Sequence, residues 1–382
     1  MVKCNGAKEH FSKNYSAKAL LCACAPIDVV VDTFLAEKQE QKSCRHFDHH
    51  EFYEFVLPMV DVHDDSKQIQ NKYLPVRYVK NLVQHYIRWM DQNGQVVDDD
   101  DLLCMYYDIC MTSSKNKKSF MSPVDFPDTE EFGYVSFDVP VVSPETFYCR
   151  DKQNTRHMPK SITLSCRVFP HHNDVGVQKV WEAGCALAEF LLQQPQHVKE
   201  KRVLEVGAGV GLTGLVAYLC CGAASVCLTD FSSKTLCNLH HNLDTNFGEY
   251  IQSVPVTVRR LDWRETLSNE NDEHSSDTLI PILEESDVLL AADVLYDPSD
   301  IPPAVQLLNT FMNDGKADKA VIFAYTLRNQ NTFKRFVDEL ITCGISYKSV
   351  DPEVMERLPN IFPCYYQQPR SHVQTYILSK SN

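Results

Sequence analysis

The feature that most constrains the fold is an alternation of strand and helix patterns from residue 175 to the end of the chain. Short apolar runs such as "RVLEV", "SVCLTD" and "KAVIFAYTLRN" are separated by amphipathic stretches of ten or more residues. Strands joined by helices of that length imply a parallel sheet that is covered on both faces. The pattern therefore predicts a doubly wound α/β domain with a mostly parallel sheet.

The expected elements can be placed by residue range. Strands are predicted over 161–169, 202–206, 225–230, 256–263, 287–296, 319–329, 345–350 and 373–380. Helices are predicted over 177–194, 211–223, 232–246 and 330–344. The polar run 268–277 is expected to be a loop that follows the strand 256–263.

The first part of the chain has a different pattern, which predicts a helical domain over 1–112. The stretch 74–90 carries apolar residues at three- and four-residue spacing, as on one face of a helix. The aspartates 98–101 favour a helix N-terminus, where the dipole stabilises negative charge, over a cation site. Ser, Lys, Asn and Pro are frequent afterwards, so we interpret 113–160 as linker and lead-in and 161–382 as the α/β domain.

Length and charge limit the possible functions. The chain has 382 residues, which is enough for two domains with cores of their own. Its formal net charge of -14 argues against a non-specific binder of nucleic acid or of an anionic membrane, because both need a basic surface. No apolar run reaches the roughly 18 residues of a membrane span. We therefore expect neither a nucleic-acid nor a membrane partner.

The cysteine pattern indicates a reduced chain without metal. The 15 cysteines include no Cys-x-x-Cys pair, although zinc ligands normally occur in closely spaced pairs. His171 and His172 have no partner ligands at useful spacing and are interpreted as loop residues. Most cysteines lie in apolar runs, which predicts a cytoplasmic chain without disulfides. Pro26 and Asp28 interrupt the apolar run 19–31, which is expected to be a buried helix rather than a signal peptide.

A glycine-rich turn, "VLEVGAGVG" (203–211), directly follows a buried apolar strand. Gly207 and Gly209 allow a sharp turn and the close approach of a ligand, and the next helix offers its N-terminal N–H groups. A dinucleotide site would need the spacing G-x-G-x-x-G, but Leu212 stands at the third position. The spacing G-x-G-x-G, with Glu205 two residues before it, favours S-adenosylmethionine over a dinucleotide. A purely structural turn is the other alternative.

Acidic and aromatic residues follow the later strands at the ends where such a ligand would lie. Asp230 ends the strand 225–230, and an acid there can accept both ribose hydroxyls. Trp263 can cover an adenine ring, and the neighbouring Asp262 can accept a hydrogen bond from an exocyclic amine. At the carboxyl edge after the fourth strand of this series, where ligands of α/β proteins bind, lie the further candidates Ala292, Asp293 and Tyr296.

Five stretches carry a resemblance to a known family. "VWEAGCALAEFL", "VLEVGAGVGLTGL" and "LLAADVLY" resemble the seven-strand protein-lysine methyltransferases that carry Asp-x-x-Tyr after strand four. "AADVLYDPSDIPPAVQLL" and "AYTLRNQNTFKRFVDEL" are similar to the members of that family that act on eukaryotic elongation factor 2. The likeness covers residues 175–345, extends weakly to the helix around 74–87, and leaves the first 60 residues unmatched.

The resemblance implies a fold and a cofactor. The fold would be the Rossmann-like class I methyltransferase fold, a doubly wound, seven-stranded, mostly parallel sheet with a reversed last strand, beside an N-terminal helical domain. The helical pattern alone predicts that Trp181 is a core residue. The resemblance instead places it on S-adenosylmethionine, with the other cofactor residues Gly207, Ala208, Gly209, Asp230, Trp263 and Ala292.

The resemblance also implies an activity. Methyl groups would pass from S-adenosylmethionine to a lysine side chain of a protein substrate, with elongation factor 2 expected in that place. Asp293 is expected to orient the lysine ammonium or assist its deprotonation, and Tyr296 to bound the lysine channel. The enzyme is expected to be a monomer.

Other functions stay open at this point. Another protein, an RNA or a small molecule could accept the methyl group, although the acidic balance and the lack of a basic aromatic strip count against RNA. An inactive cofactor-binding scaffold would be indicated by degenerate glycines or by replacement of Asp293 or Tyr296, and all of these residues are intact. A nicotinamide dehydrogenase is disfavoured because Leu212 breaks its fingerprint.

Overall fold

The computed structural model divides the chain into two compact units. One comprises Met1–Asp138 and Thr163–His171, and the other comprises Val139–Ile162 and His172–Asn382. The residues whose structure is described are 17–22, 27–41, 49–56, 76–112, 132–139, 161–167, 175–177, 179–266, 281–313, 319–358, 361–363 and 370–380. The predicted loops at His171 and His172 and at 268–277 lie outside these ranges.

The first unit is mainly helical where it is described. Its elements are α2 (Ala17–Cys22), α3 (Ile27–Gln41), α4 (His49–Val56), α5 (Val76–Gln92), α6 (Asp100–Thr112), β1 (Phe132–Asp138) and β2 (Ser161–Arg167). The predicted amphipathic helix is confirmed as α5, which buries Val79, Leu82 and Tyr86. The Tyr86 ring stacks on Phe52 with 3.7 Å between ring centroids. Its hydroxyl forms a hydrogen bond of 3.0 Å with Nδ1 of His49.

Two sequence predictions for the first unit concern where its helices begin and end. The buried helix expected over 19–31 is wrong as a single element, because α2 ends at Cys22 and α3 begins at Ile27. The aspartate run does begin a helix: Oδ1 of Asp99 accepts the N–H of Leu102 at 2.7 Å. Within the described ranges, no cluster of His, Cys, Asp and Glu could hold a metal ion. No helix there is long and apolar enough to cross a bilayer.

A two-stranded sheet, separate from the large one, contains β1 and β2. The strand expected over 161–169 is present as β2, but it pairs with β1 in the first unit instead of joining the large sheet. A hydrogen bond of 2.7 Å between the hydroxyls of Ser136 and Thr163 joins the two strands. The strand β1 itself falls in the region interpreted as linker, 113–160. Local β propensity identifies a strand, but tertiary contacts decide which sheet it joins.

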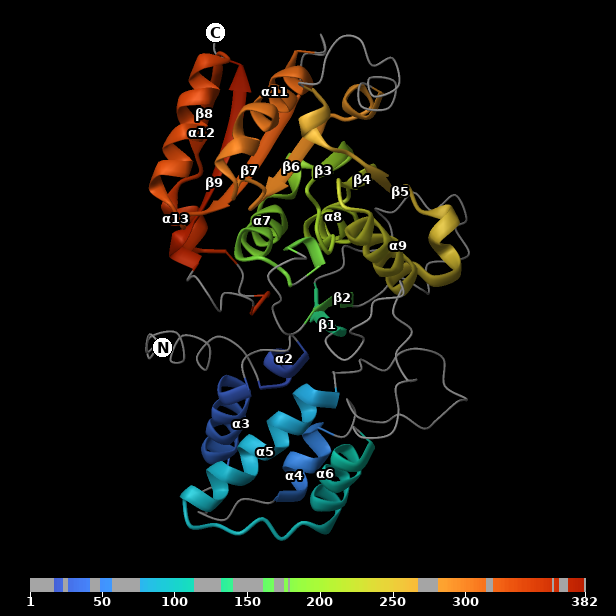
Figure 1. Cartoon of the computed structure of the whole chain (residues 1–382), viewed down its shortest axis with the longest axis vertical. Coiled ribbons are helices and arrows are strands. Elements are labelled where there is room, and N and C mark those ends of the chain that lie inside the picture. The colour runs from blue at the N-terminus through green and yellow to red at the C-terminus, as the bar shows by residue number, and fades with distance from the viewer. Residues whose placement is uncertain are drawn as a thin grey trace. The chain divides into compact units, whose positions relative to one another are not determined.

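The second unit is built on a seven-stranded sheet in the order β5-β4-β3-β6-β7-β9-β8, which can be followed by the labels in Figure 1. Its strands are β3 (Arg202–Val206), β4 (Ser225–Asp230), β5 (Val256–Arg260), β6 (Val288–Ala292), β7 (Ala320–Thr326), β8 (Ile345–Ser349) and β9 (Val373–Lys380). Neighbouring strands are parallel except for β9, which is antiparallel to β7 and β8. The predicted class I methyltransferase sheet with a reversed last strand is confirmed.

Helices pack on both faces of this sheet. They are α7 (Glu182–Gln193), α8 (Leu212–Leu219), α9 (Ser233–Phe247), α11 (Ile301–Met312), α12 (Gln330–Thr342) and α13 (Pro352–Glu356). Leu204 and Val206 of β3 join one core cluster with residues of α11 and α12. Glu205, which points to the opposite face because side chains alternate along a strand, contacts Gly214 of α8. The sheet is therefore doubly wound, as predicted.

The strand order places the candidate residues at one edge. The chain runs outward from β3 to β5 on one side and from β6 to β7 on the other, so the direction of winding changes between β3 and β6. Ligands of doubly wound sheets bind at the carboxyl ends of the strands beside such a change. The carboxyl ends of β3 to β7 all lie at this edge because these strands are parallel.

Candidate active site

The glycine turn lies at the carboxyl end of β3. A positive φ, of 62°, 56° and 87° in turn, occurs at Gly207, Gly209 and Gly211. A Cβ at Gly207 would lie 2.6 Å from Cγ1 of Val294, so both the backbone and the space require glycine there. The N–H of Ala208 donates to the carbonyl of Thr229 at 2.8 Å, which fixes the turn against β4.

Glu205 lies beneath this turn and is buried. Its Oε2 accepts the N–H of Gly214 at 2.8 Å, and its backbone carbonyl accepts the hydroxyl of Thr229 at 2.7 Å. Burial raises the pKa of the Glu205 carboxyl to about 8, although hydrogen bonds from Gly214 and Thr213 oppose the shift. Glu205 thus joins β3 to α8 and β4. Its predicted contact with the cofactor stays a prediction.

Asp230 ends β4 beside the glycine turn. Its Oδ2 accepts the N–H of Gly209 at 3.4 Å, and its Oδ1 accepts the N–H of Ser232 at 3.0 Å. Burial raises the pKa of the Asp230 carboxyl, while backbone N–H groups of Ser232, Gly209 and Phe231 lower it. The two predicted residues Gly209 and Asp230 are therefore in direct contact, although they are 21 residues apart in sequence.

The residues after β5 take two different positions. Trp263 begins a short 3-10 helix (Trp263–Thr266) and is buried, and a Cβ at Gly207 would lie 3.7 Å from its ring atom Cζ3. Trp263 therefore reaches the glycine turn, as its predicted role requires. Asp262 instead forms a two-point ion pair with Arg264, at 2.8 Å to Nε and 3.1 Å to Nη2. Its predicted contact with an exocyclic amine stays a prediction.

Charges around Asp262 keep it ionised. Burial raises the pKa of the Asp262 carboxyl, but hydrogen bonds from Arg264 and the positive charges of Arg264 and Arg260 outweigh burial and lower it. The guanidinium of Arg264 also lies 4.6 Å from the ring centre of Phe231, the residue after Asp230. This part of the edge is therefore held together by paired charges and one aromatic contact.

Asp293 follows β6 and has a positive φ of 53°. Its Oδ1 accepts the N–H of Thr326 at 2.8 Å. Its Oδ2 accepts the hydroxyl of Thr326 at 2.8 Å and Nη2 of Arg328 at 3.1 Å. The N–H of Ala183 lies 3.5 Å from the same Oδ2. The carboxylate is therefore a fixed, paired charge at the edge of the sheet.

Ala292 and Tyr296 flank Asp293. Ala292 is the last residue of β6 and pairs with Ala324 of β7. The strand predicted over 287–296 is too long, because the left-handed backbone at Asp293 ends it. The side chain of Tyr296 is exposed, as expected at the mouth of a site. Partial burial of the hydroxyl and the nearby carboxylates of Asp300 and Asp230 raise the pKa of Tyr296.

Trp181 differs from its sequence prediction. The helix expected over 177–194 begins only at Glu182, and Trp181 is its extended N-cap residue with φ of -84° and ψ of 152°. The prediction from the helical pattern that Trp181 belongs to the core is wrong, because the side chain is half-buried between two cations. Nζ of Lys179 and Cζ of Arg328 lie 4.6 Å and 5.3 Å from its ring centre.

Sequence reasoning missed two residues that join these parts. The carboxylate of Glu182 is buried, and its Oε2 lies 3.0 Å from Nη2 of Arg328. Its Oε1 lies 3.1 Å from Nζ of Lys179. Arg328 follows β7 by two residues, at the same edge as Asp293. The position of Arg328 directly after a parallel strand could have identified it from the sequence, since the residues after each parallel strand meet at this edge.

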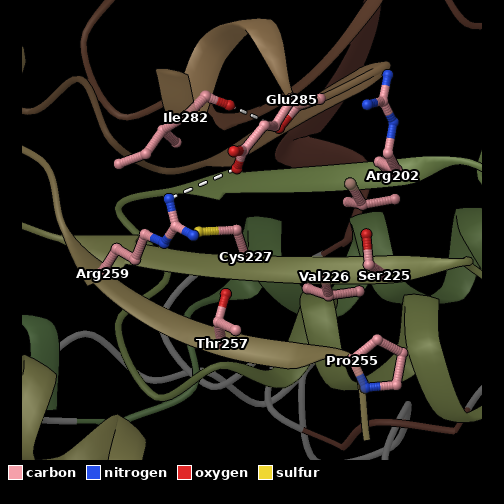
Figure 2. Close-up of a pocket in the computed structure, with 11 residues that line it drawn as sticks. Arg202, Ser225, Val226, Cys227, Pro255, Thr257, Arg259, Ile282 and Glu285 are labelled. Atoms are coloured by element: carbon pink, nitrogen blue, oxygen red, sulfur yellow. Dashed lines mark hydrogen bonds and ion pairs between the residues drawn. The ribbon is translucent and has the colours of Figure 1, made fainter. Parts of the chain in front are cut away.

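A separate recess lies at the opposite ends of the strands. Figure 2 shows its lining, which includes Arg202, Ser225 and Pro255 at or just before the starts of β3, β4 and β5. Its volume is about 190 Å³. Arg259 and Glu285 form an ion pair of 3.6 Å across it. None of the predicted site residues lines this recess.

The strand order, with β9 reversed, gives the second unit the class I methyltransferase fold. The residues present fit S-adenosylmethionine: the turn has no space for a Cβ at Gly207, a buried carboxylate ends β4 at Asp230, and the Trp263 ring adjoins the turn. Backbone N–H groups and carboxylates at such a turn suit a ligand with an amino-acid end and a ribose. The residues that would hold it are the glycine turn, Asp230 and Trp263.

Comparison with known proteins shows which kind of methyltransferase this chain resembles. Residues 170–342 match the model of a family described as lysine methyltransferase. The chain is 30% identical over 208 residues to the protein-lysine N-methyltransferase EEF2KMT of Mus musculus, covering 52% of this chain and 59% of the relative. It is 34% identical over 211 residues to the protein-lysine N-methyltransferase EFM3 of Chaetomium thermophilum, covering 54% and 59%. The chain thus spans about three-fifths of the length of these relatives.

Proposed function

We propose that the chain is an S-adenosylmethionine-dependent protein-lysine N-methyltransferase whose acceptor is elongation factor 2. The observation that carries the proposal is the pair Asp293 and Tyr296, which follows β6 at the edge that also holds the glycine turn of β3. The match of residues 170–342 to the family model described as lysine methyltransferase supports the reaction. The likeness to relatives named as protein-lysine N-methyltransferases supports a protein acceptor.

The chemistry assigns simple tasks to these residues. S-adenosylmethionine, when bound, would supply a methyl group on a sulfonium sulfur. The neutral lysine amine would attack the methyl carbon in line as the carbon–sulfur bond breaks, and the sulfur would leave as the thioether of S-adenosylhomocysteine. A lysine amine has a reference pKa near 10.4, so it must lose a proton to solvent or to a base first. The fixed charge of Asp293 attracts and orients the ammonium, and the exposed ring of Tyr296 bounds its approach. Alignment and exclusion of water supply most of the rate enhancement.

A labelling experiment tests the acceptor. The purified chain is incubated with methyl-labelled S-adenosylmethionine and either purified elongation factor 2 or lysate from cells that lack the gene. Label in one protein band of elongation factor 2 size, and in the purified factor, is expected. The matched control is the Asp230→Ala chain, which should label much less at the same limiting cofactor concentration. Mass spectrometry of the labelled band then identifies the methylated lysine.

Other outcomes lead to other functions. Label in RNA or in small molecules, with none in protein, would overturn the proposed reaction. Label in a different protein would overturn only the acceptor. Binding of S-adenosylmethionine by calorimetry without transfer to any fraction would indicate an inactive scaffold.

We also propose that the enzyme acts in the cytoplasm and as a monomer. Eight cysteines in the described ranges are all free, which supports a reducing compartment. Light scattering after size exclusion should give a mass near 43.7 kDa. A mass near twice that value, at the concentration used for the assay, would contradict the monomer.

A further inference from the structure

We propose that Arg328 is a positioning residue of the methyl-transfer site, which it organises by bridging the carboxylates of Glu182 and Asp293. This inference rests on the proposed function. It assigns to Arg328 the task of fixing the cofactor side and the acceptor side of the site relative to each other. Its side chain acts on the reacting groups only through these neighbours.

The bridge is made by one nitrogen atom. Nη2 of Arg328 lies 3.0 Å from Oε2 of Glu182 and 3.1 Å from Oδ2 of Asp293. The two carboxylates come from the first turn of α7 and from the end of β6, while Arg328 follows β7. Glu182 and Arg328 are 146 residues apart in sequence. One side chain therefore joins three elements that meet at the carboxyl edge.

Burial makes this bridge necessary. The side chains of Glu182 and Asp293 are 0% and 3% exposed, whereas that of Arg328 is 34% exposed. Two buried carboxylates that share a cation repel each other when the cation is removed, and an uncompensated buried charge is strongly unfavourable. Lys179 lies 3.1 Å from the other carboxylate oxygen of Glu182, so it offsets the charge of Glu182 but not that of Asp293. Arg328 is the cation in contact with both carboxylates among the described ion pairs.

On the Asp293 side, the bridge connects to the segment that packs against the glycine turn. Asp293 has a left-handed backbone, and the next residue is Val294. Cγ1 of Val294 occupies the space where Gly207 would carry a Cβ, at 2.6 Å. A shift of Asp293 would therefore move Val294 against the turn that is proposed to hold the cofactor. It would also move Tyr296, which lies three residues along the same segment.

On the Glu182 side, the bridge connects to Trp181. Glu182 is the first residue of α7 and directly follows Trp181, whose ring lies 5.3 Å from Cζ of Arg328. A guanidinium over an aromatic face is attracted by the ring quadrupole, and a planar guanidinium can stack there while it donates in its own plane. Arg328 thus holds the ring that is predicted to contact S-adenosylmethionine.

The test uses Arg328→Ala and Arg328→Lys, with Arg335→Ala on the exposed face of α12 as the matched control. Turnover is measured as label transferred to total lysate protein, so the result does not depend on the identity of the acceptor. We expect Arg328→Ala to lower kcat about tenfold or more while its KM for S-adenosylmethionine rises less. Arg328→Lys should restore part of kcat, because an ammonium pairs with a carboxylate but lacks the planar fork. Arg335→Ala should match the wild type.

Chemical rescue separates positioning from folding. Because Arg328 is one-third exposed, guanidinium at concentrations too low to unfold the chain can enter the space that Arg328→Ala leaves. We expect it to raise the turnover of Arg328→Ala several-fold over sodium chloride at the same concentration, and not to raise that of Arg335→Ala. Unchanged turnover of Arg328→Ala, or a loss that guanidinium and Arg328→Lys both fail to restore, would overturn the proposal.

A cycle of variants keeps the test independent of the proposed function. The dissociation constant of S-adenosylmethionine is measured by calorimetry for Glu182→Gln, Asp293→Asn and both together, with and without Arg328→Ala. Non-additive effects that become additive in the Arg328→Ala chain support the bridge even where no methyl transfer is detected. Additive effects in both backgrounds overturn it. A wild-type chain that binds no S-adenosylmethionine overturns this inference together with the proposed function.

Discussion

The backbone N–H of Thr326 donates to Oδ1 of Asp293 at 2.8 Å, and the hydroxyl of the same threonine donates to Oδ2 at 2.8 Å. This relationship ties the last residue of β7 to the residue after β6 and uses both oxygens of the carboxylate. Arg328 also donates to Oδ2, so Thr326 and Arg328 together hold the carboxylate in one orientation. We therefore expect Asp293 to orient the acceptor amine as a held negative charge.

The first prediction concerns Asp293. We expect Asp293→Asn to lower turnover about tenfold, because the charge is lost while asparagine tolerates the left-handed backbone at φ of 53°. Loss of a general base typically costs 10²–10⁴-fold, which is a larger effect. Asp293→Ala should be worse than Asp293→Asn because it adds backbone strain. Turnover and calorimetric affinity for S-adenosylmethionine are measured together. A loss near 10⁴-fold for Asp293→Asn with unchanged affinity would indicate the general base instead.

The strands that position the site could be predicted from the sequence alone. Buried strands such as Arg202–Val206 are apolar runs bounded by turn signals, so their pattern shows them without tertiary information. Because the sheet is mostly parallel, a residue that follows a strand can be assigned to the carboxyl edge from its position alone. This logic placed Gly209 and Asp230 at the same edge, and the hydrogen bond between them confirms it.

Other features depend on contacts that local pattern does not encode. The side-chain cap that would mark the start of α7 is lacking, because Trp181 stands at the N-cap, and the predicted helix was therefore too long. The apolar residues Val294 and Leu295 are buried beyond the end of β6, so the strand pattern continued past the real end at Ala292. Ion pairs between distant charges, such as Glu182 with Arg328, follow only from the assembled fold.

The second prediction concerns the glycine turn. Gly207→Ala should abolish detectable binding of S-adenosylmethionine and lower stability, because its Cβ would lie 2.6 Å from Cγ1 of Val294. Adding Val294→Ala removes that clash and should recover part of the stability, but not the strain of a positive φ. Gly248→Ala is the control, since Gly248 has φ of 53° and no atom within 4 Å of its Cβ position. Equal effects of Gly207→Ala and Gly248→Ala would show that space at the turn is unimportant.

The third prediction concerns Asp230. We expect Asp230→Ala to weaken S-adenosylmethionine binding at least about tenfold, because a buried acceptor at the ribose position is lost. Asp230→Asn should weaken binding less, since its carbonyl oxygen can still accept one hydrogen bond. Asp297→Ala is a matched control on an exposed aspartate. Calorimetric affinities equal to the wild type in Asp230→Ala would remove Asp230 from the cofactor site.

The fourth prediction separates structural charges from those of the site. The buried carboxylate of Glu189 accepts the N–H groups of Ile361 and Phe362 at 2.9 Å and 3.1 Å and pairs with Arg370. Glu189→Ala leaves Arg370 without this partner and should lower the free energy of unfolding by about 3–5 kcal/mol. Asp338→Ala, which removes an exposed ion pair with Lys334, should change it by less than about 1 kcal/mol.

Urea unfolding of these two variants measures both values. Because Glu189 holds Ile361 and Phe362 in the segment before β9, the folded fraction of Glu189→Ala should bind S-adenosylmethionine with wild-type affinity. A weakened affinity at a temperature where the variant is fully folded would contradict this separation.

The last prediction concerns the pH dependence that Glu205 imposes. Burial raises its pKa to about 8, above its ordinary value of 4.5, so the folded state holds the proton to higher pH than the unfolded state does. The stability from this group is fully present below the unfolded pKa and is lost as the pH rises through about 8. Within this window the free energy of unfolding should fall by up to about 1.4 kcal/mol per pH unit.

Glu205→Gln isolates that contribution, since glutamine cannot ionise but can still accept the N–H of Gly214. The free energy of unfolding is measured in urea from pH 5 to pH 9 for both chains. The wild-type value minus the Glu205→Gln value should fall steadily as the pH rises and level off above about pH 8. Asp230 also has a raised pKa but is present in both chains, so only its electrostatic coupling to Glu205 enters the difference. A difference that stays constant over this range would show that Glu205 is ionised in the folded protein throughout, and that the contact with α8 is made by a carboxylate.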